Sequence, residues 1–229
     1  DRGAELLLIV RREKDMAKQS IPFIDNIISR MSLEQKAGCL MTLGLSGTIE
    51  FPIVRQAIEH YHCSGFRCTP RIRKFGSYVD PATNKEVVTI ADASGYRKKG
   101  GPTSPQVSAS EYNAFLGALQ QRALRRQRGI PLHFSLDQEG GGVCEMYFRG
   151  TNRFPSPMGV AASGDPDFVY EVALAKARQL RATGLTWSHS PVLDVNVNPE
   201  NPEIGIRAFS DTPEKIIQWA IPWCKGMRD

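Results

Sequence analysis

The chain alternates between two spacings of apolar residues, and the two spacings follow each other in a fixed order. Four short segments with apolar centres have the pattern of buried strands: 39–45, 64–69, 130–136 and 185–195. The segments after them carry apolar residues three or four positions apart, as one face of a helix does: 53–61, 108–128, 165–183 and 212–229. Strand followed by helix, four times over, predicts a parallel α/β sheet, either doubly wound or part of a barrel.

Local signals place the starts and ends of several helices. Ser32 followed by Gln35 forms the pattern of a capping box, which predicts a short helix leading into Gly38. Ser108 or Ser110 is expected to cap the helix that follows the long middle segment. Asp165-Pro166 predicts another helix start, and Gly184 its end.

Two segments lie outside this repeat. Residues 1–29 form a predicted N-terminal helical extension, which Pro22 interrupts, and residues 30–229 form the main domain. Residues 70–107 are rich in Gly, Pro, Lys, Arg and Ser, with one apolar run at Val87–Ile90. Connections this long inside a domain are usually functional or mobile, so we expect an inserted loop or hairpin at a strand end.

The segment 130–142, IPLHFSLDQEGGG, combines a predicted strand with two acids and three glycines. In parallel α/β folds ligands bind at the carboxyl ends of the strands, where Asp137 and Glu139 lie. We predict that Asp137 binds a ligand rather than only capping a turn. Glu139 is expected to accept hydrogen bonds from backbone amides of the glycine loop.

Further candidates follow the fourth predicted strand. Asp194 ends that strand and is expected to anchor the loop after it. Arg207 has planar donors suited to hydroxyls or carboxylates, and either binds a ligand or pairs with Asp194 or Asp211. His133 and His189 lie within apolar strands, which is typical of hydrogen-bonded histidines in a core or at its rim.

Composition narrows the possible partners. The 229 residues carry a formal net charge of +5, and the basic excess is concentrated near 67–74 and 122–128. No aromatic residues are interleaved with these runs in a nucleic-acid-binding motif, so they predict solvated surface rather than a nucleic-acid site.

The cysteines and the hydropathy pattern bear on compartment and cofactors. Five scattered cysteines have no metal-type spacing, which favours reduced thiols and a cytoplasmic protein, with secretion as the alternative. No segment reaches the ~20 apolar residues of a membrane span. Dinucleotide, P-loop and nucleophile-elbow motifs are absent from the sequence, so no cofactor and no metal is predicted.

Four motifs, taken together and in order, resemble the N-terminal barrel domain of glycoside hydrolase family 3: MSLEQKAGCLMTLG at 31–44, IPLHFSLDQEGG at 130–141, FPSPMGVAASGDPD at 154–167 and SPVLDVNVNPENPEIGIRAFSDTPE at 190–214. The resemblance covers about residues 30–229. It implies a (β/α)8 TIM-type barrel, with about the first four β/α units in this chain. It also implies a retaining, exo-acting hydrolase of terminal β-linked sugars, of the β-N-acetylglucosaminidase and β-glucosidase branch.

The resemblance also suggests site residues. Asp137 matches the family acid that binds hydroxyls of the terminal sugar, and Arg207 matches an arginine of the family's substrate pocket. The family's DQEGG is often followed by Arg at the next position and again three residues on, where this chain has Gly142 and Glu145. Glu145 is therefore expected to reverse a charge in the pocket, unless Arg149 supplies the missing cation.

The family's catalytic groups follow the last of these motifs, and neither matches a residue of this chain. The catalytic residues therefore stay unassigned, and we expect a longer chain or a partner chain to supply the rest of the barrel. A non-catalytic carbohydrate-binding or scaffold protein of the same stock is the alternative. The four motifs disfavour a third hypothesis, a generic α/β ligand-binding domain.

Overall fold

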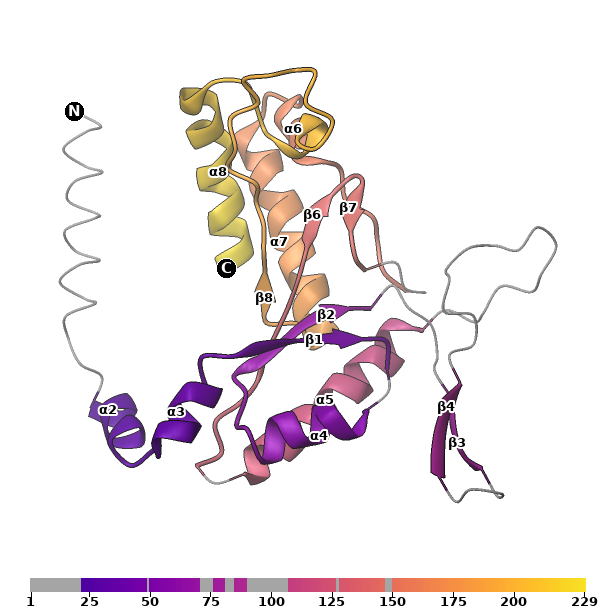
Figure 1. Cartoon of the computed structure of the whole chain (residues 1–229). Coiled ribbons are helices and arrows are strands. Elements are labelled where there is room, and N and C mark those ends of the chain that lie inside the picture. The colour runs from indigo at the N-terminus through magenta and orange to yellow at the C-terminus, as the bar shows by residue number, and fades with distance from the viewer. Residues whose placement is uncertain are drawn as a thin grey trace.

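A computed structural model describes residues 22–48, 50–70, 76–80, 85–89, 107–126, 128–146 and 150–229 (Figure 1). The helix predicted within residues 1–21 and the candidate Arg149 lie outside these ranges. At the centre is a parallel sheet whose strands are β1 (Thr42–Ser46), β2 (Gly65–Thr69), β5 (His133–Leu136) and β8 (Trp187–Ser188). Their spatial order is their order along the chain, which confirms the predicted parallel α/β sheet.

The fourth strand is much shorter than the predicted segment 185–195. Only Trp187–Ser188 pairs with β5, and the His189 amide still donates to the Leu136 carbonyl at 3.0 Å. Pro191 follows, and proline has no N–H with which to continue a ladder. The chain therefore leaves the sheet early, and the prediction of a long fourth strand is wrong.

The helices begin at the predicted signals. Ser32 and Gln35 form the capping box of α3 (Leu33–Gly38), and Ser108, rather than Ser110, caps α5 (Ala109–Arg125). The Asp165 side chain accepts a hydrogen bond at the start of α7 (Pro166–Ala182). The remaining α-helices are α2 (Pro22–Ser29), α4 (Pro52–Glu59), α6 (Pro157–Ala161) and α8 (Pro213–Arg228).

The two faces of the central sheet differ in chemistry. Successive side chains of a strand point to opposite faces, so Phe66 and Cys68 face α4 and α5 while Arg67 faces away from them. Phe66 stacks on Phe134, with their ring centroids 6.4 Å apart. The buried cluster on the helical side includes Leu45, Val54, Ile58, Phe66, Tyr112, Leu116, Phe134 and Leu136.

A second core lies between α7 and α8, which run side by side in Figure 1. Its buried members include Val160, Val169, Ala173, Phe209, Ile216, Trp219 and Trp223. Gly226 permits the close approach of the two helices, since a Cβ at this position would lie 2.4 Å from the Tyr170 carbonyl oxygen.

Two antiparallel hairpins extend from the sheet. β3 (Gly76–Asp80) pairs with β4 (Lys85–Thr89), which is the hairpin form of the insertion predicted at 70–107. β6 (Gln138–Gly140) pairs with β7 (Val143–Cys144), where the sequence predicted a loop. This second hairpin directly follows β5 and carries the candidate site.

Candidate functional site

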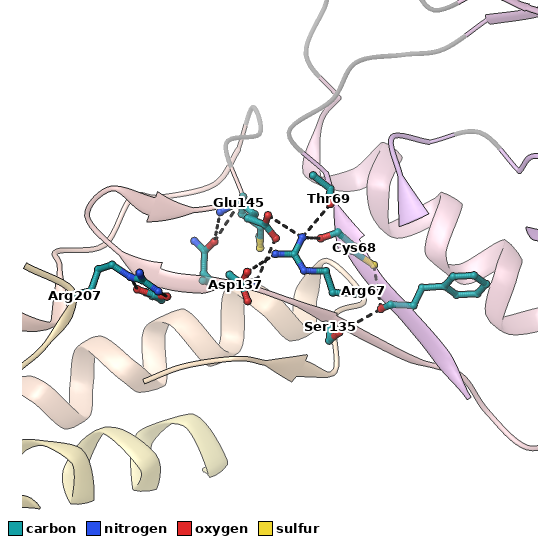
Figure 2. A network of polar contacts seen from close by, with 11 residues as sticks. Arg67, Cys68, Thr69, Ser135, Asp137, Glu145 and Arg207 are labelled. Atoms are coloured by element: carbon teal, nitrogen blue, oxygen red, sulfur yellow. Dashed lines mark hydrogen bonds and ion pairs between the residues drawn. The ribbon is translucent and has the colours of Figure 1, made fainter. Parts of the chain in front are cut away.

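The site lies at the carboxyl ends of β2 and β5, where Arg67 from one strand meets Asp137 after the other (Figure 2). Arg67 Nη2 forms a close ion pair with Asp137 Oδ2. Arg67 Nη1 donates to Glu145 Oε1 at 3.0 Å. The structure therefore brings two of the predicted residues, Asp137 and Glu145, around one arginine.

The β6–β7 hairpin returns Glu145 to Asp137. The Glu145 amide donates to the Asp137 carbonyl at 3.2 Å, and the Asp137 amide donates to Glu145 Oε2 at the same distance. The tip of the hairpin needs glycine, because Gly140 has φ 111° and a Cβ there would lie 2.0 Å from the Pro155 carbonyl oxygen. The glycines of the motif thus serve the turn that positions Glu145.

Exposure separates the roles of the two acids. The side chain of Glu145 is only 8% exposed, whereas that of Asp137 is 33% exposed. Burial opposes the charge of Arg67, but the hydrogen bonds and charges of Asp137 and Glu145 raise the pKa of its guanidinium. The carboxylate of Asp137 is therefore accessible to a ligand, whereas the buried carboxylate of Glu145 binds Arg67 from the interior side. Arg67 places a cation beside the acid at position 145, so the negative charge of Glu145 is paired within the site.

Neighbouring groups complete the surroundings of Arg67. Its Nη1 also donates to Thr69 Oγ1 at 3.0 Å, at the end of the same strand. On the opposite face of β2, burial raises the pKa of the Cys68 thiol to about 12. A thiol that stays protonated is a poor nucleophile, so Cys68 belongs to the core and not to the site.

Arg207 forms a second ion pair with Glu139, on the far side of Asp137 from Arg67 (Figure 2). Arg207 Nε and Nη2 each donate to one oxygen of Glu139 at 2.9 Å, and Nη1 donates to Glu203 Oε1 at 3.0 Å. The Glu139 side chain is only 4% exposed. The hydrogen bonds predicted from the glycine loop to Glu139 are therefore wrong. Arg207 does pair within the chain, which was one of its two predicted alternatives, but its partners are Glu139 and Glu203 and not Asp194 or Asp211.

The remaining candidates lie away from these ion pairs. Asp194 is exposed, and no hydrogen bond or ion pair of its side chain occurs within the described part of the chain, so its predicted anchoring role is wrong. The Asn196 amide ties the loop instead, donating to the Ser210 carbonyl at 3.1 Å. His133 Nε2 lies 2.9 Å from Thr42 Oγ1, which confirms a hydrogen-bonded rim histidine.

Arg67 is the functional candidate that sequence reasoning missed. The basic run at 67–74, which includes Arg67, predicts solvated surface, and for Arg67 this prediction is wrong. A usable signal was present, because Arg67 lies between Phe66 and Cys68 in a predicted strand. Because side chains alternate between the two faces of a strand, apolar Phe66 and Cys68 on one face place Arg67 on the other face, near the carboxyl end of the strand.

Among the residues that the structure describes, no three His, Cys, Asp or Glu side chains gather as a metal-binding group. No helix in the same ranges is long and apolar enough to cross a membrane.

The model of the glycosyl hydrolase family 3 N terminal domain matches residues 83–229, which is more than half of the chain. The chain belongs to glycoside hydrolase family 3. It is 32% identical over 113 residues to β-hexosaminidase A of Pseudoalteromonas piscicida, covering 48% of this chain and 19% of that protein. It is 39% identical over 113 residues to a β-hexosaminidase of Alkalilimnicola ehrlichii, covering 47% of this chain and 32% of that protein.

Among solved structures, the glycoside hydrolase family 3 β-N-acetylglucosaminidase from Paenibacillus sp. str. FPU-7 superposes with a TM-score of 0.68 at 27% identity. The superposition covers 87% of this chain and 31% of that one. The four β/α units are thus part of a TIM-type barrel, which the described residues leave open. The chain spans at most a third of the length of these three relatives.

Proposed function

We propose that this glycoside hydrolase family 3 chain provides part of the sugar-binding site of a retaining, exo-acting hydrolase. Its substrates are terminal β-linked sugars, either β-N-acetylglucosaminides or β-glucosides. The proposal rests on the position of Asp137. This residue directly follows β5 at the carboxyl edge of the sheet, and its side chain is one-third exposed. The β-hexosaminidases that match this chain support the same class of substrate.

A carboxylate in this position suits a neutral, hydroxyl-rich ligand. Each oxygen accepts hydrogen bonds, and neighbouring hydroxyls of a sugar ring donate to one carboxylate together. Hydrogen bonds to a charged group contribute roughly 1.5–3 kcal/mol each. Asp137 Oδ2 is bound to Arg67, whereas no residue in the described ranges donates to Oδ1. We assign Oδ1 to the terminal sugar.

The reaction itself needs two further groups. A retaining glycosidase uses one carboxylate as nucleophile and a second group that protonates the leaving oxygen. We assign neither role to a residue of this chain, and propose that the remainder of the barrel supplies both, from a longer chain or a partner chain. The exposed strands at the two edges of the sheet, β1 and β8, support such a complement.

A cytoplasmic location is part of the proposal. All five cysteines are free thiols, three of them buried, as expected of a protein that does not depend on disulfides. Fractionation of the source cells tests this. Recovery of the protein in the culture medium contradicts it.

Activity is tested with 4-nitrophenyl β-glycosides and the full-length protein. We expect release of nitrophenol from the N-acetyl-β-glucosaminide or the β-glucoside, and none from the matched α-glycosides. Proton NMR of the early product should show the β-anomer, since retention follows from a covalent intermediate. A protein that binds these sugars without cleaving any of them contradicts catalysis and supports the non-catalytic alternative.

A further inference from the structure

The Arg67 side chain joins two adjacent strands of the sheet at the candidate site (Figure 2). It projects from β2, and both acids that it binds follow β5 along the chain. Its three closest acceptors are Asp137 Oδ2, Glu145 Oε1 and Thr69 Oγ1. Three acceptors fix the orientation of the Arg67 guanidinium. Its bond to Oδ2 in turn fixes the orientation of the Asp137 carboxylate.

We propose that Arg67 is the positioning residue for Asp137, and that Glu145 is its counter-ion. This inference rests on the proposed sugar-binding role of Asp137. Arg67 holds one oxygen of the carboxylate and thereby turns the other toward the ligand. Glu145 Oε2 meanwhile accepts a hydrogen bond from the Asp137 amide at 3.2 Å, so both the backbone and the side chain of Asp137 are fixed.

The charges of Asp137 and Glu145 both depend on the guanidinium of Arg67. Two carboxylates share one guanidinium, and Glu145 is only 8% exposed. A buried carboxylate without a partner is costly, because it has lost its water and gained no compensating charge. Removing Arg67 therefore leaves Asp137 free to rotate and leaves two like charges close together. Removing Glu145 leaves the contact between Arg67 and Asp137 in place.

The position of the arginine also accounts for the departure from the family motif. The motif often has Arg at the position of Glu145, so that its cation would come from the hairpin after β5. In this chain the cation comes from β2 and the hairpin supplies an acid. Arg67 thus places a guanidinium beside Asp137 although position 145 is an acid. The exchange predicts that the double variant Arg67→Met/Glu145→Arg binds the sugar.

Sugar affinity tests the inference directly. Binding of N-acetylglucosamine to the full-length protein is measured by calorimetry, with thermal unfolding followed for each variant. Arg67→Met should weaken binding about 10–150-fold, the equivalent of one charged hydrogen bond. Arg67→Lys should lose less, because its ammonium keeps the charge without the planar fork. The double variant Arg67→Met/Glu145→Arg should recover to within about tenfold of the original affinity.

A matched control separates positioning from general loss of an ion pair. Arg122 on α5 binds Glu50 and Glu59 outside the site, so Arg122→Met should leave the affinity unchanged. If Arg67 acts only on folding, the double variant will regain thermal stability without regaining affinity. That result overturns the inference, as does an Arg67→Met or Arg67→Lys protein with undiminished affinity. If the Arg67→Met protein does not fold, the sugar affinity of the Arg67→Lys protein tests the positioning role instead.

The outcomes also distinguish this inference from the proposed function. A wild-type protein that binds N-acetylglucosamine but releases no nitrophenol overturns the proposed hydrolysis, while the affinities of the variants still test Arg67. A wild-type protein that hydrolyses the glycosides and is unaffected by Arg67→Met overturns only the positioning role. If the wild-type protein neither binds nor cleaves the sugar, both proposals are wrong.

Discussion

The Lys176 ammonium nitrogen lies 3.9 Å from the centroid of the Trp223 indole ring, between α7 and α8. The same nitrogen donates to the Glu139 carbonyl at 2.7 Å, and the Lys176 side chain is fully buried. Burial lowers the pKa of Lys176 to about 7, although the charges of Cys144 and Glu139 act in the opposite direction. Lys176 therefore links α7 and α8 to β6, the strand that carries Glu139. Its ammonium group has a pKa close to neutral pH.

Folding stability should rise with pH because of Lys176. The unfolded chain keeps the lysine proton up to a pKa of about 10.5, whereas the folded protein releases it near 7. Between these values the unfolded state binds more protons, so the free energy of unfolding rises with pH by up to roughly 1.4 kcal/mol per unit. Below pH 7 both states are protonated and this contribution is flat.

Urea unfolding at pH 6 to 10 measures the effect. Lys176→Met provides the reference, since it removes the titrating group and keeps an apolar side chain against Trp223. The difference in unfolding free energy between the two proteins should change with pH only above about 7. Parallel pH profiles of the two proteins would show that Lys176 keeps its ordinary pKa in the folded state.

Gly226→Ala should destabilise the packing of α7 on α8. The added Cβ would lie 2.4 Å from the Tyr170 carbonyl oxygen and 2.9 Å from the Leu174 amide nitrogen, and neither backbone atom can rotate away. Overpacking of this kind costs about 1–3 kcal/mol. Gly117→Ala on α5 is the matched control, because nothing lies within 4 Å of its added Cβ. Thermal unfolding should show a lower midpoint for Gly226→Ala only, and equal shifts in both would contradict this packing.

Arg207→Met should destabilise the protein, because it leaves the Glu139 carboxylate, 4% exposed, without its cation. Loss of one partner from a buried ion pair costs roughly 3 kcal/mol. Replacing both residues, as Arg207→Met/Glu139→Leu, should recover part of the loss. Lys215→Met removes an exposed pair with Asp211 and should have no measurable effect in the same denaturant titration. An Arg207→Met protein as stable as the Lys215→Met control contradicts a stabilising role for this ion pair.

The polypeptide of these 229 residues should associate with itself or with a partner chain. Within the described residues the central sheet is open at both edges. Large apolar side chains near its strands are exposed, including Leu40 at 88%, Trp187 at 53% and Leu193 at 56%. Unpaired edges and apolar surface favour association. Light scattering decides the matter, and a monodisperse monomer contradicts the prediction.

Local signals in the sequence were sufficient for much of the fold. The capping box at Ser32 depends only on residues three positions apart and forms as predicted. Ser108, one of the two predicted caps of α5, forms a capping box with Glu111 that was not predicted. The apolar pattern, which reflects burial in the sheet, predicted the four strands and their parallel arrangement. The length of β8 was not predicted, because apolar residues continue past Pro191 whereas the ladder ends before it.

The ion pairs of the site were harder to predict. Asp137 was found from its place at a strand end, but Arg67 is 70 residues away along the chain. Glu139 and Arg207 are 68 residues apart, and several acids near Arg207 offered equally plausible partners. Such pairings depend on the register of neighbouring strands and on the β6–β7 hairpin, which no local pattern specifies.

The catalytic efficiency of an Asp137→Ala variant tests whether Asp137 is the sugar-binding carboxylate. The value kcat/KM for 4-nitrophenyl N-acetyl-β-glucosaminide should fall about 10–150-fold in the full-length protein, through loss of at least one charged hydrogen bond. Asp167→Ala, at an exposed position in the first turn of α7, serves as the control and should keep full efficiency. An Asp137→Ala enzyme with undiminished kcat/KM would contradict the assignment.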